Sequence, residues 1–98
     1  MYTIIGTVTA RPETRAELEG ILMSQVVPTR AEPGCINYDY HVDAADPCVF
    51  VFYENWTSRA ALDAHLMMPH LEPLFCQLER LLALPVDIRP LRMLSKIA

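Results

Sequence analysis

The chain has 98 residues, 52% of them apolar and 20% charged, with a net charge of −4 at pH 7. This length gives one domain that buries roughly 60–65% of its unfolded surface, and the negative charge excludes the basic surface that nucleic acid requires. The apolar fraction is high for so short a chain, which indicates that part of its surface is covered by association. We therefore expect a single domain over residues 1–98.

The cysteines and the hydropathy pattern point to a cytoplasmic protein. Cys35, Cys48 and Cys76 show no CxxC spacing, so we expect neither a disulfide framework nor a zinc site. No apolar run approaches the ~20 residues that span a bilayer, so we expect no membrane segment.

The first third of the chain predicts a strand followed by a helix. Residues 2–10 are rich in β-branched side chains, and Gly6 within them marks a place where another group approaches the backbone closely. Thr14 and Glu17 fit a capping box that opens a helix, which Pro28 should kink or end. The inward stripe of this helix consists of Leu18, Ile21, Leu22 and Val26.

Two strands joined by a turn follow. Residues 35–42 and 48–56 have the alternation of strands, and residues 43–47 have turn chemistry. If Val42 pairs with Cys48, the register is Tyr40 opposite Phe50, Tyr38 opposite Phe52 and Ile36 opposite Glu54. A slip of one residue would turn these side chains to the other face, and the sequence leaves both registers open.

Two helices are expected in the second half. Ser58 is a candidate N-cap for a helix over residues 58–67, and His65 lies on the stripe that faces inward. A second helix begins near His70, after Pro69. Its apolar residues are Leu71, Leu74, Phe75, Leu78, Leu81 and Leu82.

The last element is an edge strand, and with it the fold class can be assigned. Residues 86–95 read as a strand, which Pro90 restricts to the edge of a sheet or to a bulge. The order β-α-β-β-α-β is that of a ferredoxin-like α+β domain with an antiparallel sheet. The helices suffice for one face of the sheet, so we expect a homodimer that covers the other face.

The candidate functional residues gather between Glu54 and His70. Glu54 and Trp56 point to one face at the end of a strand, His65 lies on the inward face of the next helix, and His70 begins the following one. A strand end, a helix face and a helix start that converge in this way form a small pocket.

Several short motifs in order resemble those of the antibiotic biosynthesis monooxygenase domain family, in particular its quinol monooxygenase branch. They are Val27-Pro28-Thr29, Pro33-Gly34-Cys35, Asp46-Pro47, Glu54-x-Trp56-x-Ser58, Ala61-Leu62-x-x-His65 and Pro69-His70. The resemblance covers nearly the whole chain. It implies a dimeric α+β barrel with a pocket in each subunit between sheet and helices.

The resemblance also implies oxidation of a small aromatic quinol or phenol by O2, without flavin, haem or metal. His65 or His70 would be the base, and Glu54 would orient a neighbour or touch the substrate. An apolar wall would come from Trp56, Phe50 and Phe52, and a hydrogen bond from Asn37, Tyr40 or Tyr53. A histidine of pKa about 6.5 removing a phenolic proton of pKa about 10 works uphill by roughly 5 kcal/mol, so the phenolate must be stabilised.

Other functions of the same fold stay open. The alternatives are an isomerase, a lactone-processing enzyme, or a dimeric barrel that binds a small ligand or serves a stress response without catalysis. Haem-degrading relatives carry an asparagine and an iron-binding histidine where this chain has Gly6 and Phe75, which argues against haem. Trp56 could equally be plain core and His65 a satisfied buried imidazole. The test is whether Trp56, His65 and His70 line one cavity.

Overall fold

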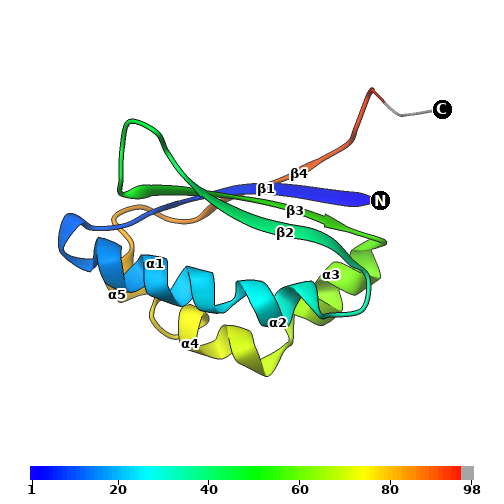
Figure 1. The fold of residues 1–98 in the computed structure, drawn as a ribbon, viewed down its shortest axis with the longest axis horizontal. Coiled ribbons are helices and arrows are strands. Elements are labelled where there is room, and N and C mark those ends of the chain that lie inside the picture. Colours follow the sequence, from blue (N-terminus) through cyan, green and yellow to red (C-terminus); the bar gives the residue numbers. More distant parts are fainter. Residues whose placement is uncertain (96–98) are drawn as a thin grey trace.

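The computed structural model describes residues 1–95 and confirms the ferredoxin-like α+β fold. Four strands form one antiparallel sheet in the order β2-β3-β1-β4. They are β1 (Tyr2–Thr9), β2 (Cys35–Val42), β3 (Val49–Trp56) and β4 (Asp87–Leu91). The helices all lie on one face of this sheet (Figure 1). A cavity between the two layers is therefore bounded by the sheet on one side and by the helices on the other.

The helices are shorter and more numerous than the periodicity predicts. They are η1 (Pro12–Thr14), α1 (Arg15–Ser24), α2 (Val26–Arg30), α3 (Arg59–Leu66), η2 (Pro69–Leu71), α4 (Glu72–Phe75) and α5 (Leu78–Leu81). Pro28 has no N–H to donate to Ser24, so the first predicted helix breaks at Gln25. Within residues 1–95, none of the helices has the length and apolarity to cross a membrane.

One predicted cap is confirmed and one is wrong. The Ser58 hydroxyl accepts a hydrogen bond from the Ala61 N–H at 3.2 Å and caps α3. Thr14 makes no capping bond, because its hydroxyl donates to the Leu81 carbonyl at 2.7 Å. Glu17, the other half of the expected capping box, binds the Arg80 guanidinium. Both side chains tie the start of α1 to α5 instead of capping α1.

The hairpin register differs by two residues from the expected one. Val42 pairs with Phe50, not Cys48, because the loop is longer and the Asp43 N–H donates to the Val49 carbonyl. The other pairs are therefore Tyr40 opposite Phe52 and Tyr38 opposite Glu54. A shift of two keeps each side chain on its face. An irregularity next to Cys35 takes Ile36 out of the ladder and leaves its side chain exposed.

The last strand is shorter than expected. It ends at Leu91, whereas the sequence predicted residues 86–95. It pairs only with β1 and all five of its residues are exposed, as expected for an edge strand that contains Pro90.

Gly6 is the place of close approach that the sequence predicted. It pairs with Phe52 across the β1–β3 ladder, and the Phe52 ring folds over it. A Cβ at position 6 would lie 2.0 Å from Cζ of that ring, far inside van der Waals contact. The glycine therefore lets Phe52 lie flat against the sheet.

A pair of glycine substitutions tests this packing. Gly6→Ala should push the Phe52 ring away from the sheet and lower the free energy of unfolding by about 1–3 kcal/mol. Gly20→Ala is the matched control, because a Cβ at this helical position meets nothing within 4 Å. It should raise stability by up to about 1 kcal/mol. Urea denaturation of both variants gives the comparison, and equal effects would contradict it.

Candidate active site

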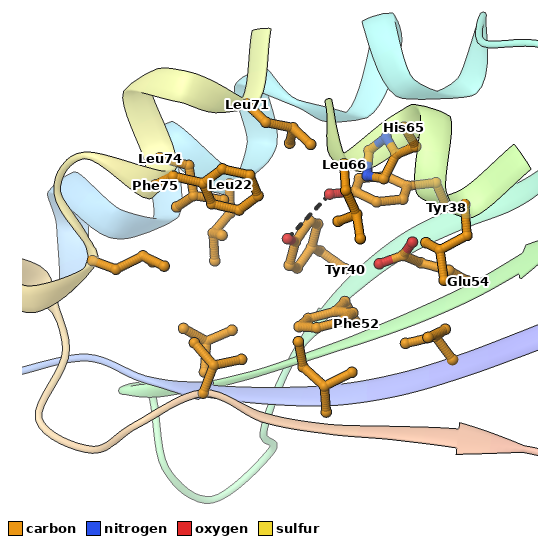
Figure 2. A pocket seen from close by; sticks show the side chains of 16 residues that line it. Leu22, Tyr38, Tyr40, Phe52, Glu54, His65, Leu66, Leu71, Leu74 and Phe75 are labelled. Carbon is orange, nitrogen blue, oxygen red and sulfur yellow. Dashed lines mark hydrogen bonds between the residues drawn. The ribbon is translucent and has the colours of Figure 1, made fainter. Parts of the chain in front are cut away.

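An apolar cavity of about 300 Å³ lies between the sheet and the helices (Figure 2). Its sheet side is formed mainly by Tyr38, Tyr40, Phe52 and Glu54, and its helix side by Leu62, His65, Leu66, Leu71, Leu74 and Phe75. Leu66, Phe75 and Ile88 line it although each is about half exposed. These three residues therefore mark where the cavity opens to solvent.

His65 brings an imidazole to the wall of this cavity. Helix α3 carries it inward, and the side chain is 3% exposed. Its Nδ1 lies 2.8 Å from Oε2 of Glu32, so Nδ1 holds the proton and Nε2 keeps a free lone pair. Burial lowers the pKa of His65 and the Glu32 carboxylate opposes this effect. His65 is thus a neutral base at neutral pH.

Trp56 lies behind His65 and not in the cavity wall. The indole is fully buried, and its ring lies 4.7 Å from the imidazole ring, centroid to centroid. Its Nε1–H donates to Oε1 of Glu54 at 2.9 Å. The expectation that indole and imidazole border one cavity is therefore not met, and Trp56 instead packs against His65 and holds Glu54.

Glu54 places a carboxyl group on the opposite side of the cavity from the helices. The indole N–H of Trp56 donates a hydrogen bond to Oε1 of Glu54, and the carboxylate points toward Tyr40 (Figure 2). Burial raises the pKa of Glu54 to about 7; the hydrogen bond from Trp56 lowers it and the charge of Glu32 raises it further. At neutral pH this group can therefore either give or take a proton.

Two tyrosines supply hydroxyl groups to the cavity. The hydroxyl oxygens of Tyr38 and Tyr40 lie 3.2 Å apart, a hydrogen bond in which either can donate (Figure 2). Burial raises the pKa of Tyr40 to about 12 and raises that of Tyr38 as well. Both stay neutral, and the hydroxyl that accepts their mutual bond keeps a proton that it can donate to an anion. Tyr38 was not predicted as a site residue, although its spacing of two from Tyr40 places both on one face.

His70 lies outside the cavity and reaches His65 through Glu32. Its Nε2 is 2.8 Å from Oε2 of Glu32, the same oxygen that binds His65, and its Nδ1 is 2.7 Å from Oε1 of Gln25. The sequence did not predict Glu32 as a site residue, although its carboxylate binds both histidines.

The cluster of Glu32, His65 and His70 has the residue types of a metal site. The three potential ligand atoms lie within 4.8 Å of one another. Two of their separations are 2.8 Å, whereas the ligand atoms of tetrahedral zinc are roughly 3.3 Å apart. The observed spacing is that of hydrogen bonds.

The family follows from comparison with known proteins. The family model described as antibiotic biosynthesis monooxygenase matches residues 1–73. The chain belongs to the antibiotic biosynthesis monooxygenase family. A Mycobacterium tuberculosis relative named "Putative monooxygenase Rv0793" is 37% identical over 95% of this chain and 91% of its own length. The crystal structure of PA3566 from Pseudomonas aeruginosa matches with a TM-score of 0.90 at 38% identity, over 96% of this chain and 94% of that one.

A third relative is longer. The Synechocystis protein sll1783 is 33% identical over 88% of this chain, and the chain spans 58% of the length of that relative.

Besides Trp56, three of the residues predicted to bind substrate lie away from the cavity. Asn37 and Tyr53 alternate with the cavity residues and face the open side of the sheet, where Asn37 donates to the Tyr53 carbonyl at 3.2 Å. Phe50 lines a separate groove, and the guanidinium carbon of Arg15 lies over its ring, 5.9 Å from the ring centre. Of the predicted set, Glu54, Phe52, Tyr40 and His65 line the cavity.

The raised pKa of Glu54 predicts a pH dependence of stability. As pH rises, the unfolded chain ionises near its ordinary value of 4.5, while the folded protein ionises near 7. Stability therefore falls across this window, by an amount on the order of 3 kcal/mol. Glu54→Gln should remove this loss, so that it is more stable than the unaltered protein at pH 8 and similar at pH 4.

Chemical denaturation at a series of pH values measures the effect. Exposed Glu13 offers a control, because Glu13→Gln should reproduce the pH profile of the unaltered protein. A Glu54→Gln profile that also falls between pH 4.5 and pH 7 would show that Glu54 is not the cause.

Proposed function

We propose that the cavity binds a small aromatic quinol or phenol and oxidises it with O2 without a cofactor. The observation that supports this most is a neutral His65 that lines a largely apolar cavity and whose Nδ1 is bound by Glu32. Such a site can remove a proton from a hydroxyl group while it excludes water from the anion that forms. Within this proposal, membership of the family gives the oxygenation chemistry.

The walls suit a flat substrate. Phe52 and Phe75 offer aromatic surface from opposite sides, and leucines fill most of the remaining helix side. A volume of about 300 Å³ is at the lower end of small-molecule sites, which favours one or two fused rings over a larger system.

Proton removal is the first step that the residues would perform. His65 accepts the proton of the substrate hydroxyl at Nε2, which breaks the O–H bond and leaves a phenolate. The lowered pKa of His65 makes this step harder than for an exposed histidine. One tyrosine hydroxyl offsets the difference by donating a hydrogen bond to the phenolate oxygen, while the other donates to it in their mutual bond.

Oxygenation then follows from the ionised ring. The ring carbon gives an electron pair to O2 and forms a C–O bond, so the ring is oxidised and O2 is reduced to a peroxide anion. His65 or protonated Glu54 returns a proton to this anion. The hydrogen on the same ring carbon then leaves as a proton: its C–H bond and the O–O bond break, the departing hydroxide combines with this proton to form water, and a carbonyl group remains on the ring. Glu54 can share the role of acid with His65 because its pKa of about 7 leaves it partly protonated.

A second candidate function is isomerisation. Glu54 and His65 are two proton carriers on one cavity, and moving a proton between two positions of a substrate needs nothing more. Such a reaction would proceed without O2.

Loss of the base tests the proposal. His65→Asn should lower turnover of a quinol about 10²–10⁴-fold, because a proton acceptor is lost while a side chain of similar shape remains. The loss should be smaller for quinols that are already ionised at the pH of the assay. Oxygen uptake by metal-free protein with a panel of quinols and anthrones measures both.

The control is His41→Asn, an exposed histidine away from the cavity, which should keep full turnover. Full activity of His65→Asn across pH 6 to 9 would show that His65 is not the base. Conversion of a substrate at the same rate without O2 would favour the isomerase.

We also propose a homodimer in which the open sheet faces pack together. This face carries half-buried Ile5, Val51 and Tyr53, and the helices cover only the other face (Figure 1). Sedimentation should give twice the chain mass at micromolar concentration. Tyr53→Asp should shift the equilibrium toward monomer, and a stable monomer of the unaltered chain would contradict the dimer.

A further inference from the structure

The cluster behind His65 runs from the cavity to the surface. Side-chain exposure rises along it, from 3% at His65 and 7% at Glu32 to 24% at His70. The two imidazole nitrogens that meet Oε2 of Glu32 each lie 2.8 Å from it. A buried base is thus connected to a histidine that solvent can reach.

The side chains around His70 place an acceptor opposite each ring nitrogen. Nδ1 faces the amide oxygen of Gln25 at 2.7 Å, and the Gln25 amide nitrogen donates to the Ser24 hydroxyl at 3.4 Å. Nε2 faces the Glu32 carboxylate. With this arrangement both ring nitrogens can donate, which is the geometry that accommodates an imidazolium.

His65 has the opposite environment. Among residues 1–95 only its Nδ1 meets an acceptor, and the ring packs against Trp56 and Tyr38, whose ring centroids lie 4.7 and 5.6 Å from its own. The single charge of Glu32 can compensate one imidazolium fully, but two cations on one oxygen would repel each other. The two histidines therefore compete for one proton, as coupled sites do.

We propose that His70 is a proton-relay residue: it holds the one excess proton of the empty site and releases it to solvent when His65 takes a proton in the cavity. Glu32 is the counter-ion that both histidines share. The coupling depends only on the cluster, whereas the source of the cavity proton rests on the proposed function.

The transfer balances in charge and in protons. The substrate O–H bond breaks and an N–H bond forms at Nε2 of His65. An N–H bond of His70 breaks, and its proton goes to water. Glu32 remains a carboxylate, so the cluster keeps its net charge while the phenolate appears. When the peroxide anion takes the proton from His65, His70 regains one from solvent.

This exchange avoids a second buried cation, which would be costly in an apolar surrounding. Other titratable groups lie around the cluster. Tyr38 and Cys35 both have pKa values raised by burial, so they stay neutral. Glu54 is bound by Trp56 and lines the same cavity as His65, and the negative charge of Glu32 raises its pKa, which favours its neutral form. Gln25 carries no charge.

Titration of the imidazole nitrogens by ¹⁵N NMR tests the coupling without any substrate. In His70→Gln the pKa of His65 should rise, because the nearby cation that lowers it is gone. In Glu32→Gln it should fall, because the carboxylate that raises it is gone. His41→Asn is the control and should leave the pKa of His65 unchanged. In the unaltered protein, the His65 signals should show two inflections, one from each histidine.

A second arm measures proton release. In His70→Gln, kcat for a quinol in dilute buffer should fall by at least about 10-fold with KM unchanged, and imidazole buffer should restore it. No turnover by the unaltered protein, with the NMR coupling present, would defeat the proposed function alone. Turnover without coupling, or a pKa of His65 that is the same in His70→Gln, would overturn the relay. One tightly held divalent metal ion per chain would also overturn it, since the ion would occupy the lone pairs assigned to protons.

Discussion

The hydrogen bond between Glu32 and His65 is the contact on which the site depends. It joins residues 33 positions apart at 2.8 Å, and so ties the segment after α2 to helix α3. It also fixes the tautomer, because a proton on Nδ1 leaves Nε2 as the lone pair that borders the cavity. An imidazole without this partner, buried against Trp56, would have two equivalent tautomers and no defined base. The carboxylate thus determines both where the ring lies and what it can accept.

The sheet contributes the complementary part of the chemistry. Phe52 lies flat because Gly6 leaves room for its ring, and the space above it becomes the cavity. Trp56 is fully buried beside this space, and its indole N–H keeps one oxygen of Glu54 occupied. A carboxyl group of pKa about 7 and a neutral imidazole consequently meet at one apolar volume from opposite layers. An acid and a base on opposite sides of one cavity are the arrangement that the proposed proton transfers need.

The sequence predicted the fold well because periodicity reports which face of an element is buried. The side of the sheet that each residue faces was predicted correctly even where the pairing was not. The hairpin register was wrong by two residues, yet Tyr40 and Phe52 still face the helices. Asn37 and Tyr53 could have been rejected from the alternation alone, since they are out of phase with Tyr40 and Glu54. Glu32 could not have been found in this way. Its role comes from contacts across more than thirty residues, and neither spacing nor local propensity encodes such contacts.

In the proposed reaction the cavity takes a proton from a bound aromatic hydroxyl group, and a chromophoric phenol tests this step. A nitrophenol absorbs visible light only when ionised, so a spectrophotometric titration of the bound probe gives its pKa in the cavity. An apolar cavity without a working base would raise this pKa by desolvation. We expect the reverse in the unaltered protein, where the pKa of the bound probe should lie below that of the free probe. In His65→Asn the pKa of the bound probe should return toward or above the free value. A bound pKa raised in the unaltered protein would contradict the account.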